Sequence, residues 1–518
     1  MLFNSHSFLF VYLPIVFCGF FLLARVGRKL AATWLTLASF FFYGWWAPQY
    51  VVLLMVSITF NFYAAKAIIR CDLHAAAASR KRPLVAALVG NLGLLAYYKY
   101  ANFFLGNLEM LNPQWHFAIE VLLPLGISFF TFTQIAFLVD AYQGKSSEPS
   151  FVHYCLFVTY FPHLIAGPVL HHNEMMPQFR KPDTYRTSAL NVSVGVAIFA
   201  IGLFKKVVIA DSLAPYSNAA FDASSGGYAL TFLEAWAGVL AYTFQLYFDF
   251  SGYSDMAIGL SRMFNVTLPL NFHSPYKASN IIDFWRRWHM TLSRFLRDYL
   301  YVPLGGNKQG RFRRYINLML TMLLGGLWHG AGWTFIIWGG LHGLFLVINH
   351  AWRWLWGRFG RENLVSPKVA RLTGMALTFL AVVVGWVFFR SDNLSAAMSM
   401  LNGMLGLNGV LLQDGWQARF GGFGDIVVHA GASFGQLRVL DTVRILGWLV
   451  LLTVVCMALP NTQEIMAKYQ PALDFRPPTK APLLAWQPNW VWGAVMGGLL
   501  AAAILLISRK SEFLYFQF

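Results

Sequence analysis

Long apolar runs recur along the whole chain, and their length limits what the chain can fold into. About ten of these runs reach roughly 20 residues, the length that an α-helix needs to cross about 30 Å of hydrocarbon. Backbone polar groups in hydrocarbon have to be satisfied inside the protein, and a helix does this within one segment. We therefore expect an all-α polytopic membrane protein in which residues 1–518 form a single integral-membrane domain.

The expected crossings share basic flanks and few internal charges. They lie near residues 6–24, 30–46, 49–65, 83–98, 119–142, 188–208, 229–250, 372–389, 443–460 and 488–507. Two further apolar stretches, 151–169 and 315–349, begin and end beside basic segments, so we expect them to enter the membrane from one side as hairpins or dips. The predicted fold is thus about 10–12 irregular membrane helices with re-entrant elements.

Composition and charge exclude a soluble protein. Hydrophobic residues make up 57% of the chain and charged residues only 12%, against about 25% charged in a typical soluble domain. The net charge of +17 would suggest nucleic acid in a soluble chain. In a membrane protein the excess of basic residues in cytoplasmic loops explains it better, so we expect membrane lipid as a partner and no nucleic acid.

The distribution of the basic residues also predicts the orientation of the chain. With the N-terminus outside, the cytoplasmic loops hold 30 of the 39 Lys and Arg residues and the outer loops hold seven. Both termini are then extracytoplasmic. The first basic residue, Arg25, follows the first apolar run, so the basic start of a cleavable signal peptide is missing and residues 6–24 should remain as a helix.

A cytoplasmic amphipathic segment is expected at 251–314, and its stretch 281–300 combines arginines with aromatic residues. If this stretch is one helix, its four arginines share a face: Arg286, Arg287, Arg294 and Arg297. They suit either anionic lipid headgroups or the phosphates of a cytosolic donor, for which we single out Arg287 and Arg294. His289 lies beside the apolar face and requires a polar partner, in either a functional or a structural role.

The apolar stretch 315–349 contains two histidines and, from residue 317 onward, no acidic or basic residue. His329 lies in the Gly-rich break between two apolar halves, which a hairpin would place near the middle of the membrane. An ionisable residue inside the membrane is a functional-site hypothesis by default, and a general base has to be neutral, the form that an apolar environment favours. We therefore predict that His329 is the base, whereas His342 fits a structural role better.

Other polar residues give weaker signals. Asp249 and Asp255 lie in a polar island at the end of an expected crossing, where they either orient a histidine or arginine or cap the following helix. The four cysteines are far apart, and the histidines match no metal-ligand spacing. We expect no metal and no bound cofactor.

Four motifs together resemble those of one family, the membrane-bound O-acyltransferases. They are F-W-R-R-W-H (284–289), L-x-D-Y-L-Y-x-P-L-G-G-N (296–307), L-L-G-G-L-W-H-G (323–330) and Y-F-D-F-S-G-Y-S-D-M-A-I-G-L (247–260). The similarity is greatest to the bacterial branch that exports acyl groups to cell-envelope polymers, especially for alginate O-acetylation. Region 391–442 departs from that branch most.

This resemblance implies a ring of membrane helices around a central funnel, with His329 as the catalytic histidine and His289 as the accompanying one. It implies acetyl-CoA as the cytosolic donor, an exported polysaccharide as the final acceptor, a bacterial inner-membrane location and a separate extracytoplasmic esterase-like acetyltransferase as partner. A transporter, or acylation of a lipid, a protein or a teichoic-acid-like polymer, stays open as an alternative. A transporter would leave the thioester of labelled acetyl-CoA intact.

The chain ends in an aromatic tail at 508–518, expected outside the cell membrane. Exposed aromatic residues are costly in water, so the tail should fold back into the protein or anchor at the membrane interface. It resembles the F-x-Y-type C-terminal motif of the small partner in teichoic-acid D-alanylation, where the tyrosine takes the acyl group. The resemblance implies that Tyr515 is an acyl relay, which is chemically consistent because a phenol and a thiol, with pKa values of about 10 and about 8.5, are similar leaving groups.

Overall fold

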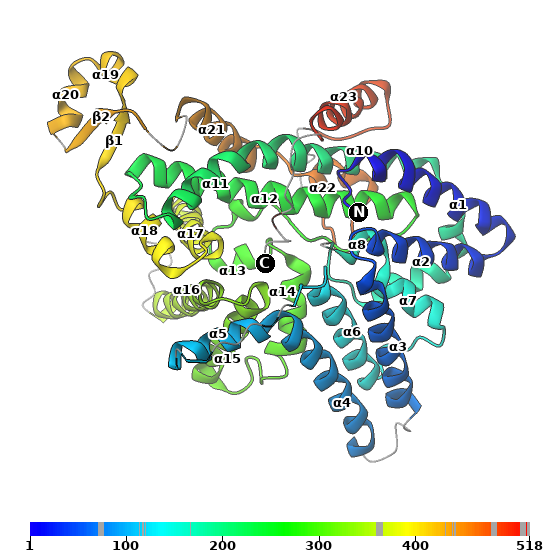
Figure 1. Ribbon diagram of the computed structural model, residues 1–518. Helices are drawn as coiled ribbons and strands as arrows, with labels where there is room; N and C mark the ends of the chain where they lie inside the picture. Colours follow the sequence, from blue (N-terminus) through cyan, green and yellow to red (C-terminus); the bar gives the residue numbers. More distant parts are fainter. Residues whose placement is uncertain are drawn as a thin grey trace.

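Helices form most of the protein, as a computed structural model shows (Figure 1). The model describes the chain except for residues 71–76, 113, 116–118, 120, 166, 359–365, 430, 438, 440–441, 478–483, 508–513 and 515–518. The α-helices of the first half are α1 (Leu13–Val26), α2 (Arg28–Gly44), α3 (Gln49–Arg70), α4 (Ala77–Leu95), α5 (Ala101–Leu111), α6 (Ile127–Tyr142), α7 (Phe151–Thr159), α8 (Phe161–Leu164), α9 (His172–Arg180), α10 (Ala189–Phe204), α11 (Asp211–Ser225) and α12 (Phe232–Met263).

The second half holds the remaining elements. Its α-helices are α13 (Ile281–Trp285), α14 (Met290–Leu296), α15 (Gly310–His329), α16 (Trp333–Arg358), α17 (Pro367–Arg390), α18 (Leu394–Met404), α19 (Asp414–Phe420), α20 (Gly422–His429), α21 (Thr442–Ala458), α22 (Thr462–Ile465) and α23 (Trp490–Leu506). Two short strands, β1 (Val410–Gln413) and β2 (Ala432–Gly435), pair in parallel. This small sheet lies in the region where the all-α expectation had placed an outer loop.

Short stretches of other helix types interrupt the α-helices. Four are π-helical: η1 (Phe8–Tyr12), η2 (Ala96–Tyr100), η4 (Lys205–Ala210) and η6 (Arg297–Tyr301). Three are 3₁₀ turns: η3 (Pro182–Tyr185), η5 (Pro275–Lys277) and η7 (Ala467–Tyr469). The irregular helices expected from the sequence are therefore confirmed.

Six helical segments in the described part of the chain have the length and composition to cross a membrane. They are Phe8–Val26, Gln49–Arg70, Arg80–Leu111, Ala189–Ser225, Trp333–Arg358 and Pro367–Arg390. Three shorter apolar helices, at Ile127–Tyr142, Arg444–Ala458 and Trp490–Leu506, overlap three more of the ten expected crossings. The chain is thus a multi-pass membrane protein. The first segment overlaps the helix expected at residues 6–24.

The segment with the expected catalytic residues lies inside the arrangement of helices. In Figure 1, α10, α11 and α12 run across the upper part of the view, α3, α4 and α6 form a bundle at the lower right, and α13 and α14 lie near the middle. Helix α13 contacts α16, and α12 contacts α17. Phe284, Trp288 and His289 are each less than 5% exposed. The aromatic face of this segment is therefore protein core.

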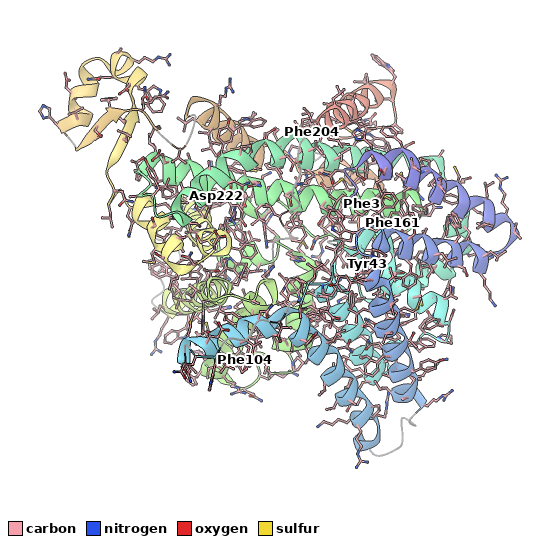
Figure 2. All side chains as sticks on the ribbon, viewed as in Figure 1. Phe3, Tyr43, Phe104, Phe161, Phe204 and Asp222 are labelled. Carbon is pink, nitrogen blue, oxygen red and sulfur yellow. The ribbon has the colours of Figure 1, made fainter. Side chains whose placement is uncertain are left out.

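The N-terminal residues also pack into the interior. Figure 2 places Phe3 near Phe161 and Tyr43. The Phe3 ring stacks on Tyr253 of α12 with 4.6 Å between centroids, and it meets Phe161 edge-on at 6.5 Å. Aromatic packing thus fastens the start of the chain to the central helix α12.

Helices α15 and α16 form the antiparallel hairpin that the sequence predicted at 315–349, although both extend beyond that range. Glycines let their backbones touch. A Cβ atom on Gly339 would clash with the carbonyl oxygen of Met322 and the backbone of Gly326, as is typical of close helix packing in membranes. The two helices are separated only by residues 330–332, so His329 lies at the turn of the hairpin.

Candidate active site

His289 occupies a break between two short helices. The sequence predicted one helix over 281–300, and this is wrong: α13 ends at Trp285, and His289 has a left-handed backbone with φ 43°. A left-handed conformation costs a non-glycine residue about 1–2 kcal/mol and persists only where its surroundings impose it. Here the Met290 N–H donates to the Asn271 carbonyl oxygen at 2.9 Å. The four arginines therefore do not share one helix face.

Asn271 holds the His289 ring and was missed by the sequence analysis. Its side-chain oxygen lies 3.0 Å from Nδ1 of His289 and accepts a hydrogen bond from the Thr291 hydroxyl at 2.9 Å. Its amide nitrogen donates to Ser254 Oγ at 3.1 Å. Because the oxygen only accepts, Nδ1 carries the proton, and Nε2 of His289 has no hydrogen-bond partner among the described residues. Asn271 lies 18 residues away in no recognisable motif.

His329 is the last residue of α15 and is 7% exposed. Its ring packs edge-on against Trp338 and Phe389, with centroids 5.1 and 5.2 Å away. It lines a cavity of about 20 Å³ together with Leu246, Phe250, Trp288, Trp338, Trp386 and Phe389, which is space for about one water molecule. Among the described residues of its lining, polar side-chain atoms come only from His329 and the three tryptophans, so the cavity can admit a small reacting group and little else.

The two predicted histidines come together around shared aromatic side chains. Trp328 lies between their rings, with centroids 4.9 Å from His329 and 6.5 Å from His289. Phe250 meets the His289 ring at 4.8 Å and also lines the small cavity. His342 is fully buried among Trp338, Trp386 and Trp285. Neither of its ring nitrogens has a hydrogen-bond partner in the described part of the chain.

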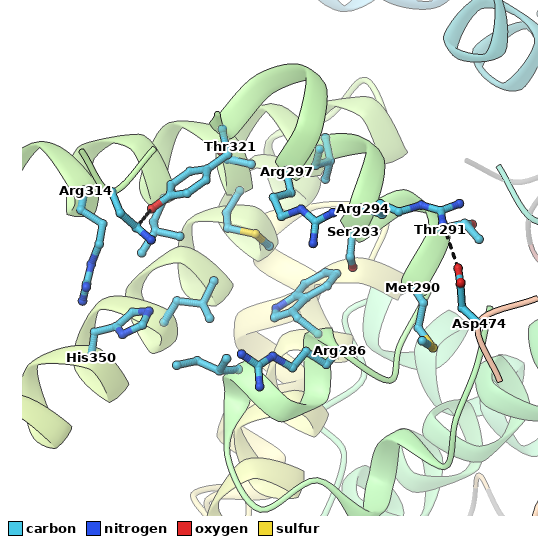
Figure 3. A pocket seen from close by; sticks show the side chains of 18 of the residues that line it. Arg286, Met290, Thr291, Ser293, Arg294, Arg297, Arg314, Thr321, His350 and Asp474 are labelled. Atoms are coloured by element: carbon cyan, nitrogen blue, oxygen red, sulfur yellow. Dashed lines mark hydrogen bonds and ion pairs between the residues drawn. The ribbon is translucent and has the colours of Figure 1, made fainter. Parts of the chain in front are cut away.

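A larger cavity of about 560 Å³ is lined by Met290 and Thr291, the two residues that follow His289. The rest of its wall comes mainly from other residues of α13, α14, η6, α15 and α16 (Figure 3). Its basic side chains are Arg286, Arg294, Arg297, Arg314 and His350. Asp474 is the one carboxylate among the described residues of its lining. Guanidinium groups suit phosphate, so the lining suits a ligand that carries phosphate groups.

The two arginines predicted to bind the donor lie in different places. Arg294 lines the larger cavity, where it pairs with Glu174 at 2.6 Å and Asp474 at 3.3 Å. Arg287 is outside the lining, with its Nε 2.9 Å from Asp283 and its guanidinium donating to the His273 carbonyl oxygen at 3.3 Å.

Two other arginines of the cavity are better placed for an anion. They are Arg286 and Arg314; in Figure 3, Arg314 lies near His350, and Arg286 lies closer to the middle of the view. Neither forms an ion pair within the described part of the chain. The sequence analysis did not single them out, because the assumed single helix at 281–300 made its four arginines equivalent and left out α15.

Asp249 and Asp255 bind lysines rather than a histidine or arginine. Lys206 Nζ lies 2.6 Å from Asp249 and 2.7 Å from Asp211, and Lys205 Nζ lies 2.7 Å from Asp255. Both lysines are on η4, beside α12. Neither of the two roles that the sequence left open is found, because the carboxylates pair with lysines and neither caps a helix.

The tail prediction lies mostly outside the described residues, and this includes Tyr515. Leu514 is described and is 3% exposed. Its backbone N–H donates to the Asp249 carboxylate. No group of three potential metal-ligating His, Cys, Asp or Glu side chains occurs in the part of the chain that the structure covers.

The model of the membrane-bound O-acyltransferase family matches residues 26–383. The chain belongs to this family. It is 45% identical to the peptidoglycan O-acetyltransferase of Helicobacter pylori, over 80% of this chain and 81% of that protein. It is 38% identical to the probable alginate O-acetylase AlgI of Pseudomonas aeruginosa, over 100% of both chains. Two of its relatives are thus named as O-acetyl transfer enzymes.

A more distant relative is the teichoic acid D-alanyltransferase of Streptococcus thermophilus, 28% identical over 51% of this chain and 68% of that protein. The family resemblance drawn from the four motifs is therefore confirmed, and the chain is an O-acyltransferase.

Proposed function

We propose that the protein takes an acetyl group from a cytosolic thioester and passes it across the inner membrane for O-acetylation of an exported polysaccharide. The observation that carries this proposal is the arginine-lined cavity of about 560 Å³ whose lining includes the two residues that follow His289. Acetyl-CoA fits it chemically, because its phosphates suit the arginines and its thin thioester arm suits the apolar residues of the lining. Both termini are placed outside in this proposal.

His329 acts as the general base in the proposed reaction. The oxygen of the accepting hydroxyl attacks the acetyl carbonyl carbon, His329 takes the hydroxyl proton, and the carbon–sulfur bond breaks to release the thiol after it regains a proton. The products are an acetyl ester and a free thiol. Enclosure of His329 by aromatic side chains supports this role, because such a site excludes water that would hydrolyse the thioester.

His289 supports the reaction from the donor side. Asn271 fixes its ring with the proton on Nδ1, so Nε2 is available as an acceptor. A neutral imidazole with one fixed nitrogen and one free nitrogen can bind the donor or relay the thiol proton. This role accounts for the strained backbone at His289.

Tyr515 is proposed as the hydroxyl that first receives the acetyl group. Burial of Leu514 and its hydrogen bond to Asp249 support the proposal, because the next residue of α12, Phe250, lines the cavity of His329. An acetyl-tyrosine keeps enough transfer potential to acylate a serine or a sugar hydroxyl. A separate extracytoplasmic esterase-like acetyltransferase then completes the transfer in this scheme.

The identity of the polysaccharide has two candidates. Alginate was favoured by the motifs, and the relative named as a peptidoglycan O-acetyltransferase adds the glycan of the cell wall. Deleting the gene and measuring ester-bound acetate in cell wall and in secreted polysaccharide separates them. Loss from only one fraction identifies the acceptor, and unchanged acetate in both would contradict acylation of either polymer.

Purified protein with acetyl-CoA labelled on the acetyl group tests the reaction itself. We expect release of free CoA that depends on His329 and transfer of label to protein or to an added hydroxyl acceptor. A transporter would leave the thioester intact.

A further inference from the structure

The helix that carries His329 ends without the usual backbone cap. The last carbonyl groups of an α-helix have no partner in the helix, and a left-handed glycine after the helix commonly provides one. Gly330 follows His329 but is extended, with φ −156° and ψ 147°. Its N–H is 3.4 Å from the Gly326 carbonyl oxygen. The final carbonyl groups of α15 therefore need donors from elsewhere.

Two neighbouring residues of the π-helix η2 supply these donors. Lys99 Nζ donates to the carbonyl oxygens of Trp328 and His329 at 2.5 and 3.1 Å. The Tyr100 hydroxyl donates to the Leu327 carbonyl oxygen at 2.9 Å. Three successive carbonyl groups at the end of α15 are thus bound from one short segment more than 220 residues earlier in the chain. A π-helical turn of this kind is frequent at functional sites.

The amino group of Lys99 is bound by the helix end rather than by a carboxylate. No ion pair joins Lys99 to an acidic side chain in the described residues. Its ammonium lies 5.8 Å from the centre of the Trp328 ring, and a cation at a helix C-terminus is favoured by the helix dipole. Burying an ammonium group inside a membrane protein is energetically costly, and such groups usually mark functional sites.

We propose that Lys99 is a positioning residue for acyl transfer, which fixes the last turn of α15 and thereby the direction of the His329 ring. The proposal rests on the proposed role of His329. Lys99 binds the backbone of His329 itself, so its loss frees the ring from the wall of a cavity that has room for about one water molecule. Tyr100 binds the carbonyl group of Leu327, two residues before His329, and holds the helix rather than the ring.

The test compares Lys99→Met, Lys99→Arg and Tyr100→Phe in the acetyl-CoA assay with purified protein. Lys99→Met keeps the length and apolar stem of the side chain. We expect kcat to fall about 10- to 100-fold, the cost typical of a misplaced catalytic group, with the KM for acetyl-CoA changed less than about threefold. Lys99→Arg should recover most of the activity, because a guanidinium group can donate to both carbonyl oxygens. Tyr100→Phe should lose less than Lys99→Met.

Lys66→Met is the matched control, because Lys66 lies in a membrane helix but contacts the Phe62 ring instead of α15. It should keep wild-type kcat. If Lys99→Met does not fold, Lys99→Gln takes its place beside Lys99→Arg. The change in kcat is then compared with the change in KM in the same way. A kcat within about threefold of wild type for Lys99→Met, or no recovery in Lys99→Arg, would overturn the inference. His329→Ala is run in parallel: its activity would reject the proposed function, whereas an inactive His329→Ala with an active Lys99→Met would reject only the role of Lys99.

Discussion

At the scale of single residues, the two histidines differ in how the chain holds them. Both could be singled out from the sequence, because histidine is rare in an apolar stretch and both histidines belong to motifs of the family. Their supports could not: Asn271 and Lys99 reach them only through the fold, and nothing in their local sequence marks them. Arg287 looked equivalent to Arg286 as long as a single helix was assumed.

The arginine cavity makes a prediction about donor affinity. Arg286→Ala and Arg314→Ala should each raise the KM for acetyl-CoA severalfold with little change in kcat, because phosphate contacts bind substrate and transition state equally. Arg294→Ala and Arg287→Ala test the two sequence-based candidates in the same assay. Arg313→Ala is the control, since Arg313 is exposed on the same helix and outside the cavity lining. Unchanged KM in Arg286→Ala and Arg314→Ala would remove the cavity as the donor site.

Tyr515 makes a prediction about the acceptor. Tyr515→Phe keeps the ring but lacks the hydroxyl that would be acetylated, so polymer acetylation should disappear while the protein still folds. Intact-mass analysis of wild-type protein trapped with acetyl-CoA should show an acetyl adduct on the C-terminal peptide. Normal polymer acetylation in the Tyr515→Phe strain would leave the tail as an anchor.

At the scale of elements, close packing of α15 and α16 sets the turn that presents His329. Gly339→Ala should destabilise the protein by about 1–3 kcal/mol, the usual cost of overpacking, because the new Cβ atom meets backbone of α15. Gly340→Ala is the matched control. Its Cβ atom would lie 3.5 Å from the Leu323 side chain, and alanine otherwise favours a helix. Thermal unfolding of purified protein measures both, and equal melting temperatures would contradict the packing argument.

The loop between α6 and α7 adds a prediction about pH. Burial alone would raise the pKa of Glu148, but hydrogen bonds from His153, His172 and the Ser150 backbone lower that pKa to about 2. A carboxylate with a lowered pKa stabilises the fold above its ordinary pKa, near 4.5, and this stabilisation is lost as the pH falls toward 2. Wild-type protein should therefore melt higher than Glu148→Gln at pH 6, and the difference should shrink between pH 4.5 and 3. A pH-independent difference would show that the charge of Glu148 is not responsible.

At the scale of the whole molecule, the membrane class, the family and the hairpin could be predicted from the sequence. The length of an apolar run and its basic flanks indicate directly that a segment lies in lipid. The breaks within segments 151–164 and 281–301 instead depend on contacts between distant parts of the chain. Tyr160 separates α7 from α8, and residues 286–289 separate α13 from α14. Neither break contains a glycine that would reveal it in the sequence. The arginine cavity was missed for the same reason, since its wall combines α13, α14, α15 and α16.

The most direct test of the account is acetyl transfer by His329→Ala protein purified and folded as wild type. Loss of a general base typically lowers the rate by about 10² to 10⁴, so release of CoA from labelled acetyl-CoA should fall by that factor, with His289→Ala also impaired. Circular dichroism and melting temperature should match wild type. A well-folded His329→Ala protein with activity within about threefold of wild type would contradict the assignment of His329 as the base.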